Sequence, residues 1–326
     1  MIMRCVTKLI VVFAAVVVGS LSGAVAAEHE VKVKCKWGSI GATLALPDEG
    51  ADTAVLIVAG SGPTDRNGNS LPVATSYCYK LLSDGLVEQG YAVMRYDKRG
   101  IGASVVDVQM IPDVVFRDFV DDAVECVRYL YDEGFERVVV AGHSEGALIA
   151  LDVAQRDECR VDGLVLLCGA GYPIDVILQR QLAAQLIPSH IGLMVSANNI
   201  IRRLKHGERV ALEDVPAELV SLFHPSVQPF IISQMQYDPA LLAVQCEVPY
   251  FVVSGGHDIQ VTVDNGEELA RGEMCAGHVV FEKMTHVLKD CDTTDRMEQI
   301  TTIYNNSWSP LSAGLVTSVA DFIATI

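Results

Sequence analysis

The segment "GHSEG" contains a serine with a glycine two residues to either side, a pattern that could support catalysis. It spans residues 142–146, directly after the apolar run "RVVVA" and before "ALIALDVA". At a strand-to-helix corner of this kind the serine is held in a strained turn, and glycines two residues to either side avoid clashes with the neighbouring chain. The helix amino terminus adds free N–H groups that stabilise a developing oxyanion. The pattern favours Ser144 as a nucleophile over a glycine-flanked helix cap.

A serine hydroxyl needs a base to take its proton and an acid to orient that base. Two downstream loops supply them. "GGHDIQV" contains Asp258 and "MTHVLKD" contains His286, and each loop follows a predicted strand. The carboxyl ends of parallel strands meet at one edge of a sheet, where sites assemble. We therefore expect Ser144, Asp258 and His286 to form a catalytic triad.

Other residues compete for the roles of base and acid. His257 adjoins Asp258, which could not easily orient its immediate neighbour, while His278 begins a strand and His143 lies within the turn itself. The position of His286 in a loop at the strand edge favours it as the base. Asp175 is the rival acid, and the tight glycine-flanked loop favours Asp258.

A second oxyanion donor is expected from the loop "AGSGPTDRNGN", residues 59–69. Its glycines let backbone N–H groups approach a substrate closely. We assign the oxyanion hole to the backbone N–H groups of Ser61 and Glu145, with Gly62 as a near alternative to Ser61. The side chain of Glu145 is interpreted as a favourable acid in a first helical turn.

The elements that must position these groups can be read from the hydrophobic pattern. Short continuous apolar runs indicate strands buried on both faces, and an amphipathic stripe predicts a helix over 116–131. Alternating strands and helices predict an α/β fold with a mostly parallel, doubly wound sheet. Two alternating segments before it predict an opening hairpin that turns at Gly38 and Ser39. The predicted strands are 54–60, 91–97, 137–142, 163–169, 250–256 and 278–284.

The interval between Gly171 and Pro249 is too long for a simple crossover. Helical spacing interrupted by several prolines predicts an inserted helical cap, with a second structural domain as the alternative. The predicted organisation is a signal peptide at 1–27, the first part of the core at 28–171, the cap at 172–248 and the second part of the core at 249–326.

The first residues predict export. Arg4 and Lys8 precede the apolar run "LIVVFAAVVV", and small residues lead to a cleavage site near Ala26 or Ala27. The mature protein is therefore expected to be periplasmic or secreted, with no stable membrane partner. The formal charge of −17 argues against nucleic acid as a partner. No motif for a metal or nucleotide cofactor is present, so we expect neither.

Five ordered motifs carry a resemblance to a known family. "GSGPTDRNGN", "YDKRGIGAS", "GHSEG", "GGHDIQV" and "THVLK" resemble those of the α/β-hydrolase superfamily, and more narrowly of bacterial secreted esterases and serine-aminopeptidase-like hydrolases with a helical cap. The resemblance spans about residues 31–324 and implies the triad Ser144, Asp258 and His286. One departure is Ala59, where many relatives carry histidine before the glycine.

The function expected from the sequence is hydrolysis of small to medium carboxylic esters through an acyl-enzyme. A serine aminopeptidase is the alternative enzyme, and the cap acids Glu208, Glu213, Asp214 and Glu218 could then bind the substrate's amine. A non-catalytic binding protein on a hydrolase fold is the alternative from another class. The substrate's acyl and alcohol groups and the oligomeric state do not follow from the sequence.

Overall fold

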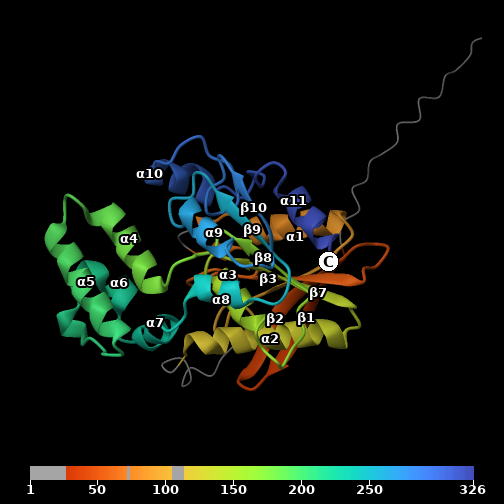
Figure 1. Cartoon of the computed structure of the whole chain (residues 1–326), viewed down its shortest axis with the longest axis horizontal. Coiled ribbons are helices and arrows are strands. Elements are labelled where there is room, and N and C mark those ends of the chain that lie inside the picture. Colours follow the sequence, from red (N-terminus) through yellow and green to blue (C-terminus); the bar gives the residue numbers. More distant parts are fainter. Residues whose placement is uncertain (1–26, 72–73, 105–113) are drawn as a thin grey trace, which may run out of the picture.

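An eight-stranded sheet lies at the centre of the molecule (Figure 1). The computed structural model describes residues 27–71, 74–104 and 114–326. The order of the strands across the sheet is β1-β2-β6-β3-β7-β8-β9-β10, and β4 (Asn69–Ser70) and β5 (Ala74–Thr75) form a separate small hairpin. The sheet strands are β1 (Ala27–Cys35), β2 (Gly38–Leu46), β3 (Thr53–Val58), β6 (Ala92–Tyr96), β7 (Arg137–His143), β8 (Gly163–Leu167), β9 (Tyr250–Gly255) and β10 (Cys275–Phe281).

The sheet is parallel from β6 to β10 and antiparallel only where β1 and β2 join it. Every residue of β3, β8 and β9 is buried, as expected for continuous apolar runs with helices on both faces. The predicted α/β architecture with a mostly parallel sheet is confirmed.

Helices cover both faces of the sheet (Figure 1). The core helices are α1 (Cys78–Glu88), α2 (Phe116–Asp132), α3 (Glu145–Val153), α8 (Pro239–Gln245), α9 (Val263–Leu269), α10 (Arg296–Gln299) and α11 (Leu315–Ile323), with a π-helical turn at Ile300–Tyr304. One hydrophobic cluster joins α1 and α11 to the sheet, and another joins α2, α3 and α8 to it. The stripe predicted over 116–131 therefore forms α2 and packs as its pattern requires.

The opening hairpin differs from the predicted one in its turn. Cys35 pairs with Gly38, so the turn consists of Lys36 and Trp37, two residues before the predicted position. The indole N–H of Trp37 donates to Asp122 at 2.7 Å, and the guanidinium of Arg99 lies over its ring. These long-range contacts hold Trp37 outside the strands, and alternation within the sequence could not indicate them.

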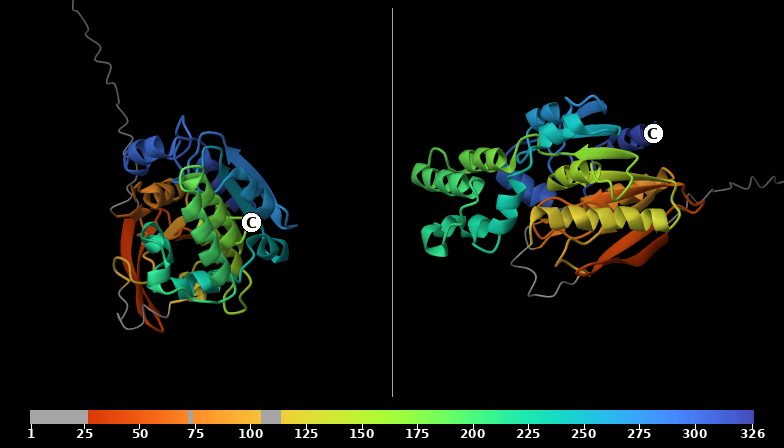
Figure 2. Two further views of the ribbon diagram at one scale, coloured as in Figure 1. Left: turned by 90° about the vertical axis from the view of Figure 1, so that its left-hand side faces the viewer. Right: turned by 60° about the horizontal axis from the view of Figure 1, so that its bottom comes forward.

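A group of helices extends from one end of the sheet, as Figure 1 and the right-hand view in Figure 2 show. It consists of α4 (Ile174–Leu186), α5 (Ile191–Lys205), α6 (Val220–Phe223) and α7 (Gln228–Gln234), with short 3-10 turns at Leu212–Asp214 and Ala217–Leu219. These helices share a hydrophobic cluster of their own, which includes Leu204 and Phe223. We call this group of helices, residues 174–237, the cap.

Helix α8 differs from the expectation of a cap that continues to residue 248. It packs on α3 and α9, and its Ala243 belongs to the cluster beneath the sheet. The crossover from β8 to β9 therefore includes a core helix of its own, and the cap is an insertion ahead of it.

The predicted signal peptide lies, apart from Ala27, outside the described residues. Within the ranges that the structure describes, no helix is long and apolar enough to cross a membrane.

Candidate active site

Ser144 occupies the corner between β7 and α3. Its φ of 56° and ψ of −119° are strained for a residue with a side chain, and its N–H donates to the carbonyl of Leu167 at 2.9 Å. A Cβ at Gly142 would collide with the carbonyl of Gly146, and a Cβ at Gly146 would collide with the carbonyl of Val58. The two glycines therefore let the turn close tightly and let α3 approach β3.

Asp258 and His286 meet although 28 residues separate them in the sequence. Asp258 follows β9 and His286 follows β10, and Nδ1 of His286 lies 2.8 Å from Oδ2 of Asp258. The other carboxylate oxygen accepts the backbone N–H groups of Gln260 at 2.8 Å and Val261 at 2.9 Å. Both residues are almost completely buried. The carboxylate is thus fixed on one side and holds the imidazole on the other.

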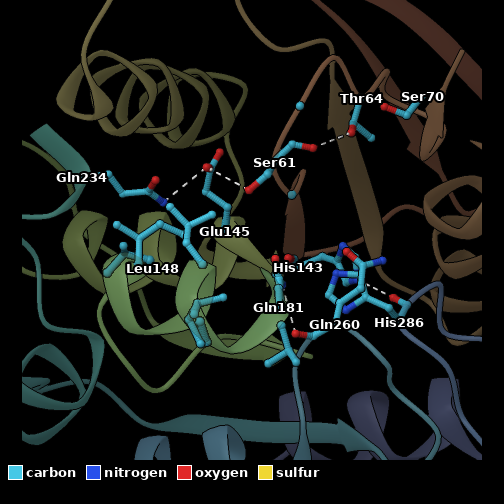
Figure 3. A pocket seen from close by; sticks show the side chains of 18 of the residues that line it. Ser61, Thr64, Ser70, His143, Glu145, Leu148, Gln181, Gln234, Gln260 and His286 are labelled. Atoms are coloured by element: carbon cyan, nitrogen blue, oxygen red, sulfur yellow. Dashed lines mark hydrogen bonds between the residues drawn. The ribbon is translucent and has the colours of Figure 1, made fainter. Parts of the chain in front are cut away.

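Ser144 and His286 line the same pocket, whose volume is about 500 Å³. Figure 3 shows His286 in this pocket. Within the described ranges, Oγ of Ser144 and Nε2 of His286 share no hydrogen bond in this structure. Catalytic hydrogen bonds are often long before substrate binds. In this structure Asp258 is hydrogen-bonded to His286, and Ser144 and His286 both line the pocket.

The competing residues have other partners. Nδ1 of His257 lies 2.6 Å from the carbonyl of Cys291, and Nε2 of His278 lies 2.9 Å from the hydroxyl of Ser254. The rival acid Asp175 forms an ion pair with Lys205 at 2.8 Å, within the cap. None of these contacts leads to Ser144.

His143 lies beside Ser144, but both of its ring nitrogens are in hydrogen bonds. The Tyr79 hydroxyl accepts the N–H of Gly60 at 3.0 Å and lies 2.7 Å from Nδ1 of His143, while Nε2 of His143 lies 2.7 Å from the carbonyl of His286. Burial, with the nearby His286, lowers the pKa of His143 to about 3. A neutral imidazole that accepts from Tyr79 and donates to His286 satisfies every contact.

The loop predicted to supply an oxyanion donor passes close to the serine. A Cβ at Gly60 would lie 3.0 Å from Cβ of Ser144, and Ser61 lines the pocket. The loop is held to the sheet by Arg66, which forms an ion pair with Asp97 at 2.8 Å. That pairing, together with the hydrogen bonds to Asp97, lowers the pKa of Asp97 despite its burial.

Sequence reasoning missed the partners that surround Glu145. Its carboxylate forms a buried ion pair with Lys98 at 3.0 Å, and it also accepts from the Ser61 hydroxyl at 3.0 Å and from the Gln234 amide at 3.3 Å. Glu145 is therefore more than a favourable acid in a helical turn. The position of Lys98 just after a predicted strand is only a weak indication of a role in the site, because nothing in the sequence links Lys98 to Glu145.

Three buried groups could be considered as metal ligands: His143, Cys168 and His286 present ligand atoms within 4.8 Å of one another. The donor set does not suit a metal, because both nitrogens of His143 are in hydrogen bonds and Nδ1 of His286 is bonded to Asp258. Burial also raises the pKa of the Cys168 thiol well above its ordinary value, which keeps it protonated.

Known structures share this fold. The Pyrococcus furiosus esterase Pf2001 superposes with a TM-score of 0.56 at 17% identity, over 92% of this chain and 91% of that one. Est1E from Butyrivibrio proteoclasticus, in a structure with ferulic acid bound, superposes with a TM-score of 0.55 at 15% identity, over 90% and 98%. At such identities the likeness concerns the fold, which is that of the α/β-hydrolases.

Comparison of sequences identifies the family in addition to the fold. Esterase EstD of Thermotoga maritima is 26% identical over 240 residues, which is 72% of this chain. The chain spans about half the length, 54%, of this curated relative. The model of the serine aminopeptidase S33 family matches residues 73–288, more than half of the chain and including Ser144, Asp258 and His286. The resemblance seen in the motifs is confirmed, and this chain belongs to the serine aminopeptidase S33 family.

Proposed function

We propose that this protein is an exported serine hydrolase that cleaves small to medium carboxylic esters through an acyl-enzyme. The observation that carries the proposal is the Asp258–His286 hydrogen bond at the wall of the pocket that also contains Ser144. The esterases named among its relatives support the class of reaction. Export rests on the apolar leader alone.

In the proposed reaction, Nε2 of His286 takes the proton of the Ser144 hydroxyl while Oγ attacks the ester carbonyl. The electron pair of the carbonyl moves to its oxygen, which accepts hydrogen bonds from the N–H groups of Ser61 and Glu145. The proton on His286 then passes to the departing alcohol. Water repeats the sequence on the acyl-enzyme, with His286 again as base, and releases the carboxylic acid. Asp258 keeps the imidazole in the tautomer that presents a free Nε2.

The lining of the pocket favours a neutral ester over a peptide with a free amino terminus. Glu145 is the one carboxylate among the lining residues that the structure describes, and Lys98 already neutralises it. The four cap acids that could have bound an amine are exposed and do not line the pocket: Glu208, Glu213, Asp214 and Glu218. An aminopeptidase would need a free negative charge, and the described residues of the pocket lining offer none.

The experiment is an assay of nitrophenyl esters and aminoacyl nitroanilides, with fluorophosphonate labelling, on wild type and on Ser144→Ala. We expect ester turnover and labelling in the wild type, and a loss of at least about 10⁴-fold in kcat in the variant, because the nucleophile is absent. Equal turnover by both proteins removes Ser144 from the mechanism. An unlabelled and inactive wild type points to a binding protein.

A matched pair of aspartates tests the acid. Asp258→Asn is expected to lower kcat by about 10³- to 10⁴-fold, because an amide stabilises the wrong tautomer of the base. Asp175→Asn should leave kcat within about twofold, because Asp175 pairs with Lys205 in the cap. The reverse result assigns the acid to Asp175.

A further inference from the structure

Lys98 is a buried cation that the proposed reaction does not use. The residue is 4% exposed, and its Nζ donates to the carbonyl of Gly60 at 2.9 Å and to the carboxylate of Glu145 at 3.0 Å. Nζ also lies 4.6 Å from the centre of the Phe119 ring. A lysine is almost never buried this deeply unless it is paired. Its two hydrogen bonds end on the two segments that contain the proposed oxyanion donors.

The bond to Gly60 fixes the direction of one of these donors. The carbonyl of Gly60 and the N–H of Ser61 belong to one planar trans peptide group, so they point in opposite directions. A cation on that oxygen holds the peptide plane in place and polarises the N–H into a stronger donor. Among the described residues, no acceptor takes the N–H of Ser61, and Ser61 lines the pocket.

The bond to Glu145 fixes the other donor. Glu145 is the first residue of α3, where its N–H has no partner within the helix. Its carboxylate is held by Lys98 and also accepts from the Ser61 hydroxyl. The side chain of Glu145 thereby ties the loop of residues 59–69 to the amino terminus of α3, across the position where an oxyanion would form.

The same carboxylate reaches the cap. Nε2 of Gln234, in α7, donates to Oε2 of Glu145 at 3.3 Å. Gln234 is itself buried. Figure 3 shows Gln234 and Ser61 pointing toward the Glu145 carboxylate from opposite sides. The position of α7 is therefore linked to the two backbone donors through one carboxylate.

We propose that the Lys98–Glu145 ion pair positions the two N–H groups of the oxyanion hole, and that Gln234 makes their position depend on the seating of the cap. This proposal rests on the proposed ester hydrolysis. Lys98 is a positioning residue, because it acts through Gly60 and Glu145 and does not line the pocket. Gln234 lines the pocket, and its proposed positioning role acts through Glu145.

The first test is Lys98→Met, which keeps the length of the side chain and removes the cation. We expect kcat to fall by about ten- to a hundredfold with KM within about twofold, because the donors matter most when charge develops on the oxygen. A trifluoromethyl ketone forms a tetrahedral oxyanion when the Ser144 hydroxyl adds to its carbonyl. The inhibition constant of this compound should rise by the same factor as kcat/KM falls. A kcat and an inhibition constant that both remain at wild-type values overturn the proposal.

Two further variants separate positioning from stability. Lys98→Met leaves a buried carboxylate unpaired, so the double variant Lys98→Met with Glu145→Gln should regain thermal stability without regaining kcat. Arg99→Met is the matched control, since Arg99 is the neighbouring buried cation and pairs with Asp118 and Asp122, away from the oxyanion loop. It should keep kcat within about threefold. A loss in Arg99→Met equal to that in Lys98→Met overturns the proposal.

Gln234→Leu tests the link to the cap and is expected to lower kcat by about two- to fivefold, since one neutral hydrogen bond is lost. An unchanged kcat removes the cap from the proposal. Ser144→Ala is measured alongside. If it retains activity, the proposed function fails. If activity requires Ser144 while Lys98→Met behaves as wild type, only the present inference fails.

Discussion

His143 is buried beside Ser144, the proposed nucleophile, and its surroundings require it to be neutral. Its contacts to Tyr79 and to the carbonyl of His286 use one acceptor and one donor, which is what a neutral imidazole offers. Through the Tyr79 hydroxyl, the ring connects Gly60 in the loop of residues 59–69 to the backbone of His286, the proposed base. Protonation would replace the acceptor with a second donor that faces a hydroxyl already receiving the N–H of Gly60.

This arrangement makes the stability of the protein depend on pH. The unfolded chain binds a proton at His143 below a pH of about 6.5, whereas the folded chain does so only near the lowered pKa of about 3. The unfolded state therefore binds more protons between these values, and the free energy of unfolding decreases as the pH falls. At about pH 5 we expect His143 to lower the free energy of unfolding by about 2 kcal/mol relative to neutral pH.

Urea unfolding of wild type and His143→Gln, at about pH 7.5 and about pH 5, measures this contribution. Glutamine also offers an acceptor oxygen and a donor NH₂ group but does not titrate in this range. The wild type should lose more stability on acidification than the variant. An equal loss in both proteins would show that His143 does not contribute to the acid sensitivity.

The hydrogen bond between Asp258 and His286 could be expected from the sequence, whereas the contacts of Glu145 could not. Asp258 and His286 lie in loops that follow adjacent predicted strands, so both come to the same sheet edge. Lys98 and Glu145 are 47 residues apart, and Gln234 lies a further 89 beyond Glu145. No local pattern records such pairings.

At the scale of elements, the closeness of α3 to β3 determines where the proposed nucleophile lies. Gly146→Ala would place a methyl group against the carbonyl oxygen of Val58, which is backbone and cannot rotate away. We expect a loss of about 1–3 kcal/mol in the free energy of unfolding. A fall in kcat should accompany it, because α3 contains Glu145. Chemical denaturation and ester kinetics check both effects.

Gly192→Ala is the matched control, because this glycine lies in α5 with nothing within 4 Å of the added carbon. The same change there should be neutral or stabilise the protein by up to about 1 kcal/mol. If both alanine variants behave alike, the close approach of α3 to β3 does not explain the glycine.

The parallel strands and α2 could be predicted because each has a clear pattern of apolar residues along the sequence. The six parallel strands and α2 lie within a few residues of the expected ranges. The hairpin turn lies two residues before the expected position, because contacts from Asp122 and Arg99 hold Trp37 in the turn. Helix α8 was assigned to the cap because a short helix has the same apolar spacing on a sheet as in an insertion.

At the scale of the whole molecule, the pocket lies between the sheet edge and the cap. Ile177 in α4 lines the pocket but is not part of the cap's own cluster. We expect Ile177→Trp to lower kcat/KM for an octanoyl ester by about tenfold relative to an acetyl ester, because the larger ring fills space needed by a long acyl chain. A series of esters of increasing acyl length measures the change.

Val195→Trp adds the same side chain to an exposed position on α5, outside the pocket. It should leave the preference for acyl length unchanged. If it alters the preference as Ile177→Trp does, the selectivity does not come from the pocket wall. The sequence could not give this wall, since it depends on how the cap helices pack over the core.

The cap has an interior separate from the two clusters that hold the sheet and its helices together. Mutations that reshape its inner wall therefore need not disturb the scaffold beneath. During divergence, one lineage can acquire a new substrate range through changes in this insertion while inheriting its reaction chemistry intact. Two residues of α7 are exceptions, because Gln234 donates to Glu145 and Phe230 packs against Phe116 and Phe119 of the core helix α2.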